Sequence, residues 1–344
     1  MRAVRLHSPG EALRLEEVPL PDPVGTEVRI RVGGAGVCHT DLHIVDGTQT
    51  RVELPVTLGH EVAGWIDAAG PAAEPLLRRL HLEPRDAVVV HGGWGCGDCR
   101  ECRADAEQRC AESRAPGFQV DGGYAEAMTV PHPRHLVALG GLDPARAAPL
   151  ADAAVTPYRA VRRAEPWLTA GSRVLLIGCG AVGQFALQFL RLAPPAGDEL
   201  LIGVRELDPR RLERASELGA DVAMLDGDAG MVTEALGGPA DVVLDLVGTE
   251  PTLALASAVV APGGLVMLVG EAGGTLPFGF EGPPVESWLT TAAWGSATEL
   301  REVVQLARRG RIRWNVETMP LADAAAAHGR LRGGDVDGRL VLVP

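Results

Sequence analysis

Four closely spaced cysteines constrain the fold of this chain more than any other feature of its sequence. Cys96, Cys99, Cys102 and Cys110 follow the spacing C-x2-C-x2-C-x7-C inside a glycine-rich segment. Two-residue gaps direct neighbouring sulfur atoms at one centre, and soft thiolates suit a tetrahedral zinc ion. Because four thiolates complete the coordination of the metal, the spacing predicts a closed structural zinc site with no open position for catalysis.

The alternative interpretation of these cysteines is a pair of disulfides in an exported domain. No apolar signal segment follows Met1, and the chain of 344 residues is far longer than disulfide-stapled scaffolds. Zinc is therefore favoured. The two remaining cysteines, Cys38 and Cys179, have different neighbours, and we expect Cys179 to be a small buried thiol between two glycines.

Composition limits the class of protein. The length predicts two domains, and 46% hydrophobic residues are sufficient for two cores. A net charge of -13 argues against a nucleic-acid partner, because phosphate binding requires clustered cations. The chain has no lysine, which excludes lysine-based catalysis. No apolar run reaches the roughly 18 residues of a membrane span, so we expect a soluble, cytoplasmic protein without a membrane partner.

The pattern of apolar residues changes along the chain. In the first 150 residues, short predicted strands such as 27–32 and 87–90 alternate with glycine and proline, which is typical of an all-β domain. From about residue 155, predicted strands alternate with predicted helices, beginning with a strand at 174–177 and a helix at 181–192. Such alternation predicts a doubly wound parallel sheet, and hence an α/β fold.

These patterns divide the chain into three segments. We expect a β catalytic domain at 1–150 that includes the zinc lobe at 92–112, a cofactor domain at 151–288, and a return of 289–344 to the first domain. The stretches 70–84 and 192–198 are predicted to be irregular surface connections.

The predicted strand at 174–177 leads into a glycine-rich turn, Gly178-Cys179-Gly180-Ala181-Val182-Gly183, and then into a helix. Glycines in this context allow a tight turn and the approach of a pyrophosphate to the helix N-terminus, so these residues are predicted to bind a dinucleotide. Glu206 follows the next strand and is predicted to accept hydrogen bonds from the adenosine ribose. Its charge favours NAD over NADP, although Arg205 and Arg210 flank it.

Two further glycine-rich turns carry metal-ligand residue types. Cys38 lies in the segment 36–43 and His60 in the segment 58–64, and Asp152 is a candidate third ligand. A catalytic zinc takes three protein ligands and keeps one open position. From residue type alone, a single cysteine or histidine is more often a buried or surface residue than a ligand.

Taken together, these motifs resemble the zinc-dependent alcohol dehydrogenases of the medium-chain dehydrogenase/reductase family. The matching segments are 36–41, 59–61, the four-cysteine segment, 121–126, 152–158, 178–183, 208–212, 219–221 and 338–341. The resemblance implies a GroES-like β catalytic domain, a Rossmann domain for NAD, and two zinc ions per chain.

The resemblance also implies roles for the catalytic zinc ligands. Cys38, His60 and Asp152 occupy the ligand positions, and Glu61 matches a residue beside the metal that acts as a transient or outer ligand. Many relatives have cysteine where this chain has Asp152, and aspartate occurs in members that act on secondary alcohols and ketones. A carboxylate is a harder ligand than a thiolate, but the total ligand charge is unchanged.

Further residues are expected to serve the reaction and the cofactor. The Thr40 hydroxyl can accept the alcohol proton, and the resemblance implies transfer through the cofactor ribose to His43, whose pKa suits such a step. Matching positions in relatives imply that the remaining cofactor contacts come from His39, Arg211, Val269, Gly270 and Arg339. Trp94 and Trp294 are candidates for the apolar wall of a substrate pocket, although a core position is commoner for tryptophan.

The resulting prediction is an NAD-dependent zinc alcohol dehydrogenase that interconverts small alcohols, especially secondary ones, with ketones or aldehydes. A polyol dehydrogenase or aldehyde reductase of the same family is the first alternative, because pocket shape separates them. A zinc-free nucleotide-binding scaffold is the second. The family further implies a homo-oligomer, either a tetramer or a dimer.

Overall fold

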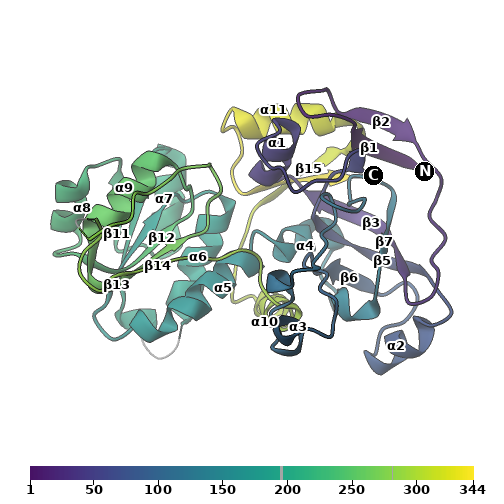
Figure 1. Cartoon of the computed structure of the whole chain (residues 1–344), viewed down its shortest axis with the longest axis horizontal. Coiled ribbons are helices and arrows are strands. Elements are labelled where there is room, and N and C mark those ends of the chain that lie inside the picture. Colours follow the sequence, from purple (N-terminus) through teal and green to yellow (C-terminus); the bar gives the residue numbers. More distant parts are fainter. Residues whose placement is uncertain (194–196, 281) are drawn as a thin grey trace. The chain divides into compact units, whose positions relative to one another are not determined.

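The computed structural model describes residues 1–193, 197–280 and 282–344, and the chain forms two compact units (Figure 1). The β-rich unit consists of Met1–Val155 and Trp294–Pro344, and the second unit is Thr156–Ala293. The sequence pattern predicted that the second unit begins at residue 151 and that the return to the first unit begins at residue 289. Both boundaries lie a few residues before those of the structure. The connection predicted at 192–198 includes residues 194–196, which lie outside the described part of the chain. Among the described residues, no helix is both long and apolar enough to span a membrane.

The β-rich unit contains two sheets. One has the order β2-β1-β4, and the other has the order β15-β16-β3-β5-β6-β8, with β7 also paired to β3. All of these strand pairs are antiparallel except β15 with β16. The strands are β1 (Arg2–Leu6), β2 (Arg14–Glu17), β3 (Val28–Gly36), β4 (Val56–Thr57), β5 (Glu61–Ala69), β6 (Ala87–Val90), β7 (Ala127–Val130), β8 (Leu136–Ala138), β15 (Val316–Pro320) and β16 (Arg339–Val343).

Alternation of buried and exposed residues explains this sheet. Val28, Ile30 and Val32 of β3 are at most 4% exposed, whereas Arg29 and Arg31 between them are more accessible. Side chains at every second position of a strand face one side, so β3 buries its valine and isoleucine in the core. Each such side chain contributes about 1.5 to 3 kcal/mol on burial.

Short helices, which the sequence pattern did not indicate, connect the strands of the predicted β domain at 1–150. They are α1 (His39–Val45), α2 (Glu74–Arg79), α3 (Arg100–Arg103) and α4 (Pro144–Ala147), and α2 lies within the predicted irregular stretch 70–84. Helices of four to seven residues are too short to show a repeating apolar face, so the sequence pattern did not reveal them.

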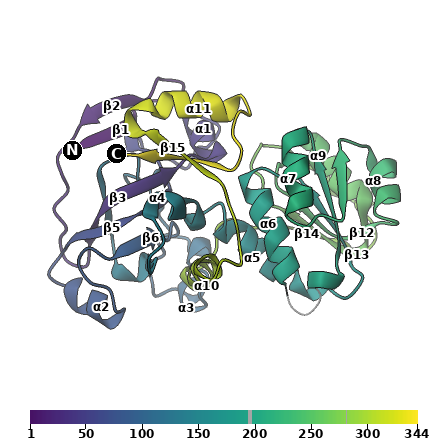
Figure 2. The ribbon, with the colours of Figure 1, turned by 180° about the vertical axis from the view of Figure 1, so that it is seen from behind.

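The C-terminal segment belongs to the β-rich unit. It contributes α10 (Ala297–Arg308), α11 (Ala324–Arg332) and the strands β15 and β16. Strand β16 pairs with β3, and α11 packs beside α1, as Figure 2 shows. Residues near both ends of the chain therefore complete one sheet, which brings Arg339 of β16 next to Glu61 of β5.

The second unit is built around a six-stranded sheet with the order β11-β10-β9-β12-β13-β14. All of its strand pairs are parallel. The strands are β9 (Arg173–Ile177), β10 (Leu201–Glu206), β11 (Val222–Leu225), β12 (Ala240–Asp245), β13 (Val260–Leu268) and β14 (Trp288–Thr291). Val174 and Ile177 of β9 are fully buried, as expected for a strand covered on both faces.

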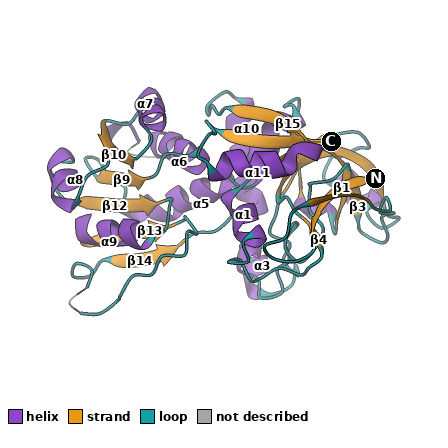
Figure 3. Ribbon diagram, turned by 90° about the horizontal axis from the view of Figure 1, so that it is seen from above, coloured by secondary structure: helices purple, strands orange, loops and turns teal. Residues whose placement is uncertain are grey.

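Helices cover this sheet on both faces (Figure 3). Its connections are α6 (Ala181–Leu192), α7 (Pro209–Glu217), α8 (Ala229–Ala235) and α9 (Glu250–Val259), and α5 (Val155–Ala164) leads into the unit. α6 packs with α7, and α8 packs with α9. The predicted α/β fold with a doubly wound parallel sheet is confirmed. The order of strands changes direction between β9 and β12, and ligands bind at such switch points in open α/β sheets.

Candidate active site

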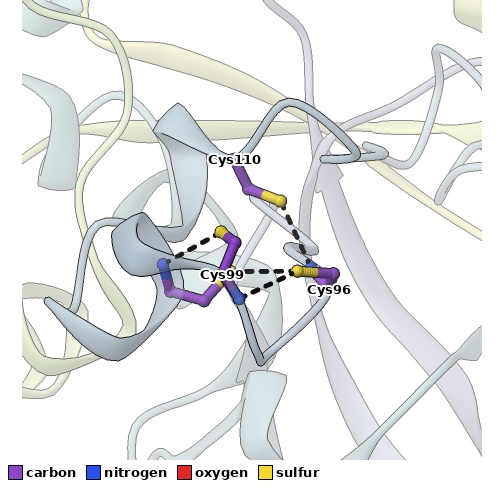
Figure 4. A group of neighbouring side chains, drawn as sticks. Cys96, Cys99 and Cys110 are labelled. Carbon is purple, nitrogen blue, oxygen red and sulfur yellow. Dashed lines mark hydrogen bonds between the residues drawn. The ribbon is translucent and has the colours of Figure 1, made fainter.

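The four cysteines of the lobe lie together on a short loop that includes α3 and ends at Cys110. Cys96, Cys99 and Cys110 point toward one another in Figure 4, and one ligand atom from each of the four residues lies within 4.8 Å of the others. The Cys96 sulfur is 3.9 Å from the Cys102 sulfur, and all of these cysteines are free thiols. The arrangement fits one tetrahedral zinc ion.

Backbone N–H groups stabilise negative charge on these sulfurs. The Cys99 N–H donates to the Cys96 sulfur at 3.4 Å, and the Cys102 N–H donates to the Cys99 sulfur at 3.5 Å. The N–H groups of Asp98 and Cys99 lower the pKa of Cys96 to about 7, whereas burial raises the pKa of Cys102 to about 12. A bound cation is what allows all four to ionise together.

A second group of metal-ligand residues forms where α1, β5 and the chain before α5 meet. Cys38 precedes α1, His60 precedes β5, and Asp152 follows a 3-10 turn at Ala148–Ala151. The Asp152 Oδ2 atom lies 3.5 Å from His60 Nε2 and 3.8 Å from the Cys38 sulfur. The structure thus brings together three residues that are up to 114 positions apart in the sequence.

These donor atoms fit a zinc ion. Ligands of tetrahedral zinc are about 3.3 to 3.6 Å apart for mixed sulfur, nitrogen and oxygen donors. A thiolate, a neutral imidazole and a carboxylate together carry two negative charges, which balance the charge of the ion. Cys38 and His60 are buried, whereas the Asp152 side chain is 17% exposed, so the group is accessible from the aspartate side.

A buried carboxylate faces the Nδ1 side of the His60 imidazole. Asp41 Oδ1 lies 3.5 Å from His60 Nδ1, and Asp41 Oδ2 accepts hydrogen bonds from the Cys38 N–H at 2.9 Å and the Tyr124 hydroxyl at 3.1 Å. Burial raises the pKa of Asp41, but the adjacent His60 lowers this pKa by a larger amount. The pKa of Asp41 is therefore below its ordinary value. An ionised Asp41 leaves Nε2 of His60 facing Asp152 as the candidate ligand atom.

Charges also determine the state of His60 without a metal. Burial lowers the pKa of His60, but Asp41, Asp152 and Cys38 outweigh it and raise this pKa well above the ordinary value. The surroundings therefore favour a positive charge at this place. A metal ion supplies that charge when it replaces the proton.

Glu61, which follows His60 directly, forms a buried ion pair with Arg339. The Arg339 Nε atom donates to Glu61 Oε2 at 2.8 Å, and Arg339 Nη2 pairs with Glu61 Oε1. Burial lowers the pKa of Arg339, but Glu61 raises it well above the ordinary value, so the guanidinium remains charged. A Cβ atom at Gly36 would collide with the Glu61 carboxylate, which explains the glycine there. Arg339 is 4% exposed and also lies 3.8 Å from Asp152.

The predicted proton-transfer residues lie on α1. The Thr40 hydroxyl is 3.7 Å from the Cys38 sulfur. His43 is three positions further along α1 and therefore on the same face of the helix, where it is half-buried. His39, the first residue of α1, is exposed.

In the second unit, the glycine-rich turn connects β9 to α6. A Cβ atom at Gly183 would collide with the backbone of Gly178, whereas one at Gly180 would have no neighbour within 4 Å. Gly183 thus permits close packing of the helix on the strand, and the space beside Gly180 remains open at the N-terminus of α6. Ala181 and Val182 form the first turn of that helix. The turn fits the pyrophosphate of a dinucleotide.

Glu206 lies at the end of β10, next to this turn. Its carboxylate accepts hydrogen bonds from the backbone N–H groups of Cys179 at 2.7 Å, Leu207 at 2.7 Å and Asp208 at 3.1 Å. Glu206 is 8% exposed. Its flanking arginines have carboxylate partners of their own: Arg205 pairs with Asp226, and Arg210 donates to Asp208 at 2.9 Å.

Other predicted cofactor residues surround the same edge of the sheet. Val269 and Gly270 follow β13, and the backbone N–H of each donates to the Asp245 carbonyl. Arg211, in the first turn of α7, lies 3.9 Å from Asp208. Asp245 was not singled out from the sequence. Its side chain accepts from the N–H groups of Val247 and Gly248, which fixes the turn after β12 opposite Gly178.

The two tryptophans have different surroundings. The Trp294 ring lies 6.1 Å from the His60 ring and 5.9 Å from the Phe118 ring, both edge to face. Trp94 is buried, donates from its indole N–H to the His91 carbonyl at 2.6 Å and packs near His135. Cys38, His60 and Asp152 form the Cys38 group. Trp294 contacts this group through the His60 ring, whereas Trp94 packs in the core near the lobe.

Sequence reasoning missed the residues that surround the candidate metal ligands. Asp41 and Tyr124 lie in segments that match the family, but neither was assigned a role. The spacing of Asp41 three residues after Cys38, at the start of a helix, was the available signal, because such a residue can accept from the backbone of the N-cap. His328, 3.3 Å from the Tyr124 hydroxyl, carries no such signal because it comes from α11.

Comparison with known families agrees with this geometry. Residues 25–140 match the alcohol dehydrogenase GroES-like domain, and residues 218–342 match the zinc-binding dehydrogenase family. The first match confirms the predicted GroES-like domain.

Full-length relatives give the same result. The chain is 36% identical to a D-arabinose 1-dehydrogenase (NADP(+)) of Saccharolobus solfataricus, covering 100% of this chain and 97% of the relative. It is 35% identical to an NAD-dependent alcohol dehydrogenase of Sulfurisphaera tokodaii, covering 100% of both chains. Among solved structures, the alcohol dehydrogenase of Aeropyrum pernix has a TM-score of 0.91 and 34% identity, with 100% of both chains covered.

Proposed function

We propose that this chain interconverts secondary alcohols and ketones with NAD. The chain belongs to the zinc-dependent alcohol dehydrogenases of the medium-chain dehydrogenase/reductase family, and it is an oxidoreductase that acts on CH–OH groups. One zinc ion is held by Cys38, His60 and Asp152 for catalysis. A second is held by the four cysteines of the lobe for stability.

The observation that carries this proposal is the convergence of Cys38, His60 and Asp152. Their donor atoms come from three separate segments and lie within 4.8 Å of one another. Glu61 belongs to the same group, but Arg339 neutralises it, so the three remaining donors match the charge of one divalent ion. An aspartate in the third position supports secondary alcohols and ketones as the substrate class, on the family resemblance.

Bound zinc supplies a Lewis acid that lowers the pKa of an alcohol hydroxyl, and NAD supplies the hydride acceptor. Thr40 relays the proton of the hydroxyl: its Oγ1 atom, which lies beside Cys38 at the start of α1, takes up that proton while the proton already on Oγ1 is passed on toward His43. His43 passes the proton to solvent from the same face of that helix. Trp294 and Phe118 provide an apolar surface next to His60 for the carbon atoms of the substrate.

The surroundings of Glu206 support NAD rather than NADP. Its carboxylate is fixed at the glycine-rich turn by three backbone N–H groups, where a 2'-phosphate would meet like charge. Arg205 and Arg210 are the nearest candidates to compensate that charge, but they pair with Asp226 and Asp208. This assignment differs from the cofactor named for the Saccharolobus D-arabinose dehydrogenase.

A sugar or polyol dehydrogenase is the second candidate function. The full-length similarity to the D-arabinose 1-dehydrogenase favours it. Both candidates use the same metal ligands, so the shape and polarity of the substrate pocket separate them.

Steady-state kinetics with purified protein test both candidates. The panel contains primary alcohols, secondary alcohols, polyols and aldoses, each with NAD and with NADP, and formation of the reduced nicotinamide is followed by its absorbance. We expect the highest kcat/KM for a secondary alcohol with NAD. A preference for aldoses would establish the second candidate, and turnover with NADP alone would refute the cofactor assignment.

The variant Glu206→Gln sharpens the cofactor test. It retains the size of the side chain and removes the charge, so kcat/KM with NADP should rise relative to NAD by roughly 10-fold. Glu217→Gln, an exposed carboxylate at the end of α7, is the matched control and should leave that ratio unchanged.

We also propose a homo-oligomer, a tetramer as in bacterial members of the family or else a dimer. β14 is an edge strand, and Trp288 on it is 63% exposed. Light scattering on the purified protein tests this, and a monomeric mass would refute it.

A further inference from the structure

A third group of metal-ligand residues lies in the β-rich unit, apart from the two groups described above. His91 follows β6, Glu107 begins a 3-10 turn of the cysteine lobe at Glu107–Arg109, and His135 ends a 3-10 turn before β8. Glu107 Oε2 lies 3.7 Å from His91 Nδ1 and 3.9 Å from His135 Nδ1. The two imidazole rings are stacked, with an angle of 13° between their planes.

All three side chains are buried, and their facing atoms lack hydrogen-bond partners. His91 and His135 are 0% exposed and Glu107 is 7% exposed. Within the described residues, no hydrogen bond is made by His91 Nδ1, Glu107 Oε2 or either ring nitrogen of His135. Leaving buried polar atoms unpaired costs about 1 to 3 kcal/mol for each group, which favours binding of a partner at this place.

The hydrogen bonding of His91 identifies the kind of partner. His91 Nε2 lies 2.7 Å from the Gly295 carbonyl oxygen, which can only accept, so Nε2 carries the proton and donates it. Nδ1 therefore presents a lone pair to Glu107 Oε2, which presents another. Two acceptors 3.7 Å apart repel each other unless a proton or a metal ion lies between them. A metal-bound histidine commonly donates its other N–H to a backbone carbonyl in this way.

The charge state of the two imidazoles also suits a metal. Burial lowers the pKa of His91, and burial lowers the pKa of His135 well below its ordinary value, so both rings are neutral and keep a lone pair. Burial raises the pKa of Glu107 despite Arg134, whose Nε lies 3.4 Å from the other oxygen, Oε1. Asp105 and Arg301 are the further charged groups that act on this site.

We propose that His91, Glu107 and His135 bind a divalent transition-metal ion of the zinc type, through His91 Nδ1, Glu107 Oε2 and one ring nitrogen of His135. Two imidazoles and one carboxylate are a ligand set that zinc accepts. The separations of 3.7 and 3.9 Å are close to those of tetrahedral zinc ligands, about 3.3 Å for nitrogen and oxygen donors.

The position of the site gives it a structural role. Glu107 lies between Cys102 and Cys110 in the lobe. His91 and His135 lie at the adjoining ends of β6 and β8, and the His91 N–H donates a hydrogen bond to the His135 carbonyl. A metal at this place joins the lobe to the sheet. It thus anchors the lobe independently of the cysteine-bound zinc.

Metal content tests the proposal without reference to dehydrogenase activity. The full-length protein is stripped with a chelator, reloaded with Zn²⁺, passed through a desalting column and measured by elemental analysis. Wild type should bind one metal ion more per chain than Glu107→Gln and His135→Phe, which remove a ligand at nearly constant volume. Circular dichroism verifies that the variants fold.

A surface pair provides matched controls. His7 Nε2 lies 2.6 Å from Glu16 Oε1, and both side chains are about one-third exposed. His7→Gln and Glu16→Gln therefore remove the same residue types from a histidine–glutamate pair outside the proposed site, and the metal content should equal that of wild type.

His135→Phe also separates the proposal from a metal-free buried cluster. If the site binds metal, the melting temperature of wild type rises when this site is loaded, and the variant lacks that part of the rise. If it does not, replacing an unpaired buried imidazole with phenyl raises the melting temperature and leaves the metal content unchanged, which would overturn the proposal.

Cobalt provides a readout on wild type alone, should the variants fail to fold. The other two groups contain thiolates, whereas this one contains none, so Co²⁺ bound here adds visible ligand-field absorption without sulfur-to-cobalt charge transfer. Titration of the stripped protein should show one such thiolate-free equivalent. If every equivalent bound by wild type carries thiolate charge transfer, the proposal is refuted.

Discussion

The cysteine lobe and the Cys38 group bring candidate metal ligands together in opposite ways. The lobe takes four identical residues from one short segment, and its sulfurs are held by the N–H groups of that same segment. The Cys38 group takes three different residues from positions 38, 60 and 152, and its charges are set by side chains from elsewhere in the unit.

The difference teaches what each site requires of the rest of the fold. Four thiolates complete the coordination of a metal by themselves, so the lobe needs little support beyond its own loop. A site with three ligands and an accessible side needs its ligands oriented from outside. Asp41 faces the Nδ1 atom of His60 and so favours one orientation of the ring. Arg339 pairs with Glu61, so the Glu61 carboxylate is less available to bind the metal.

The largest expected effect comes from removing a ligand of the Cys38 group. Asp152→Ala should lose one zinc per chain and lower kcat/KM by about a thousandfold or more, because a Lewis acid contributes several kcal/mol to such a reaction. Asp22→Ala, whose side chain is 99% exposed, is the control. Zinc content and kinetics measured together check this, and full zinc content with unchanged activity would remove Asp152 from the ligand set.

A ligand removed from the lobe should act on stability instead. Cys99→Ser should lose one zinc and lower the melting temperature by roughly 5 to 10 °C, since binding energy at a structural site is folding energy. At a temperature where the variant stays folded, kcat should remain close to wild type. Cys179→Ala should keep its zinc content, because Cys179 belongs to the glycine-rich turn. If Cys99→Ser lost activity while remaining folded, the contrast between the two sites would fail.

Removing the charge of Asp41 tests whether the Cys38 group depends on outside support. Asp41→Asn keeps the size of the side chain but weakens the orientation of His60, so the zinc affinity of this group should fall by roughly 10- to 100-fold. The lobe should be unaffected. Competition with a chromophoric chelator measures both affinities in one titration, and an equal loss at both sites would indicate general destabilisation.

The smallest effect is expected for Tyr124, which contacts Asp41 and not the candidate metal ligands. Tyr124→Phe removes the hydroxyl that donates to Asp41 and lies near His328, which should lower the free energy of unfolding by about 1 kcal/mol. Asp41 retains the Cys38 N–H, so zinc affinity should stay within about threefold of wild type. Denaturant unfolding and the same chelator titration measure these effects. A loss as large as that of Asp41→Asn would show that Tyr124 orients Asp41.

Much of the second unit was predictable because its signals are local. The apolar run of β9, the glycines after it and the helix α6 follow one another directly, and the predicted helix at 181–192 has the observed bounds. The cysteine lobe was predictable for the same reason, since the spacing of its residues alone directs them at one centre. The short helices α1 to α4 were missed because none is long enough to show a periodic face.

The sequence by itself identified residues whose types and short spacings suit metal and nucleotide binding, because residue type and short spacing fix the chemistry of a local segment. Only the tertiary structure decided which distant residues meet: Asp41 with His60, Arg339 with Glu61, and Glu107 with His91 and His135. These contacts join strands and loops that are far apart along the chain. They depend on how the sheets of the β-rich unit pair, and no short-range pattern encodes that pairing.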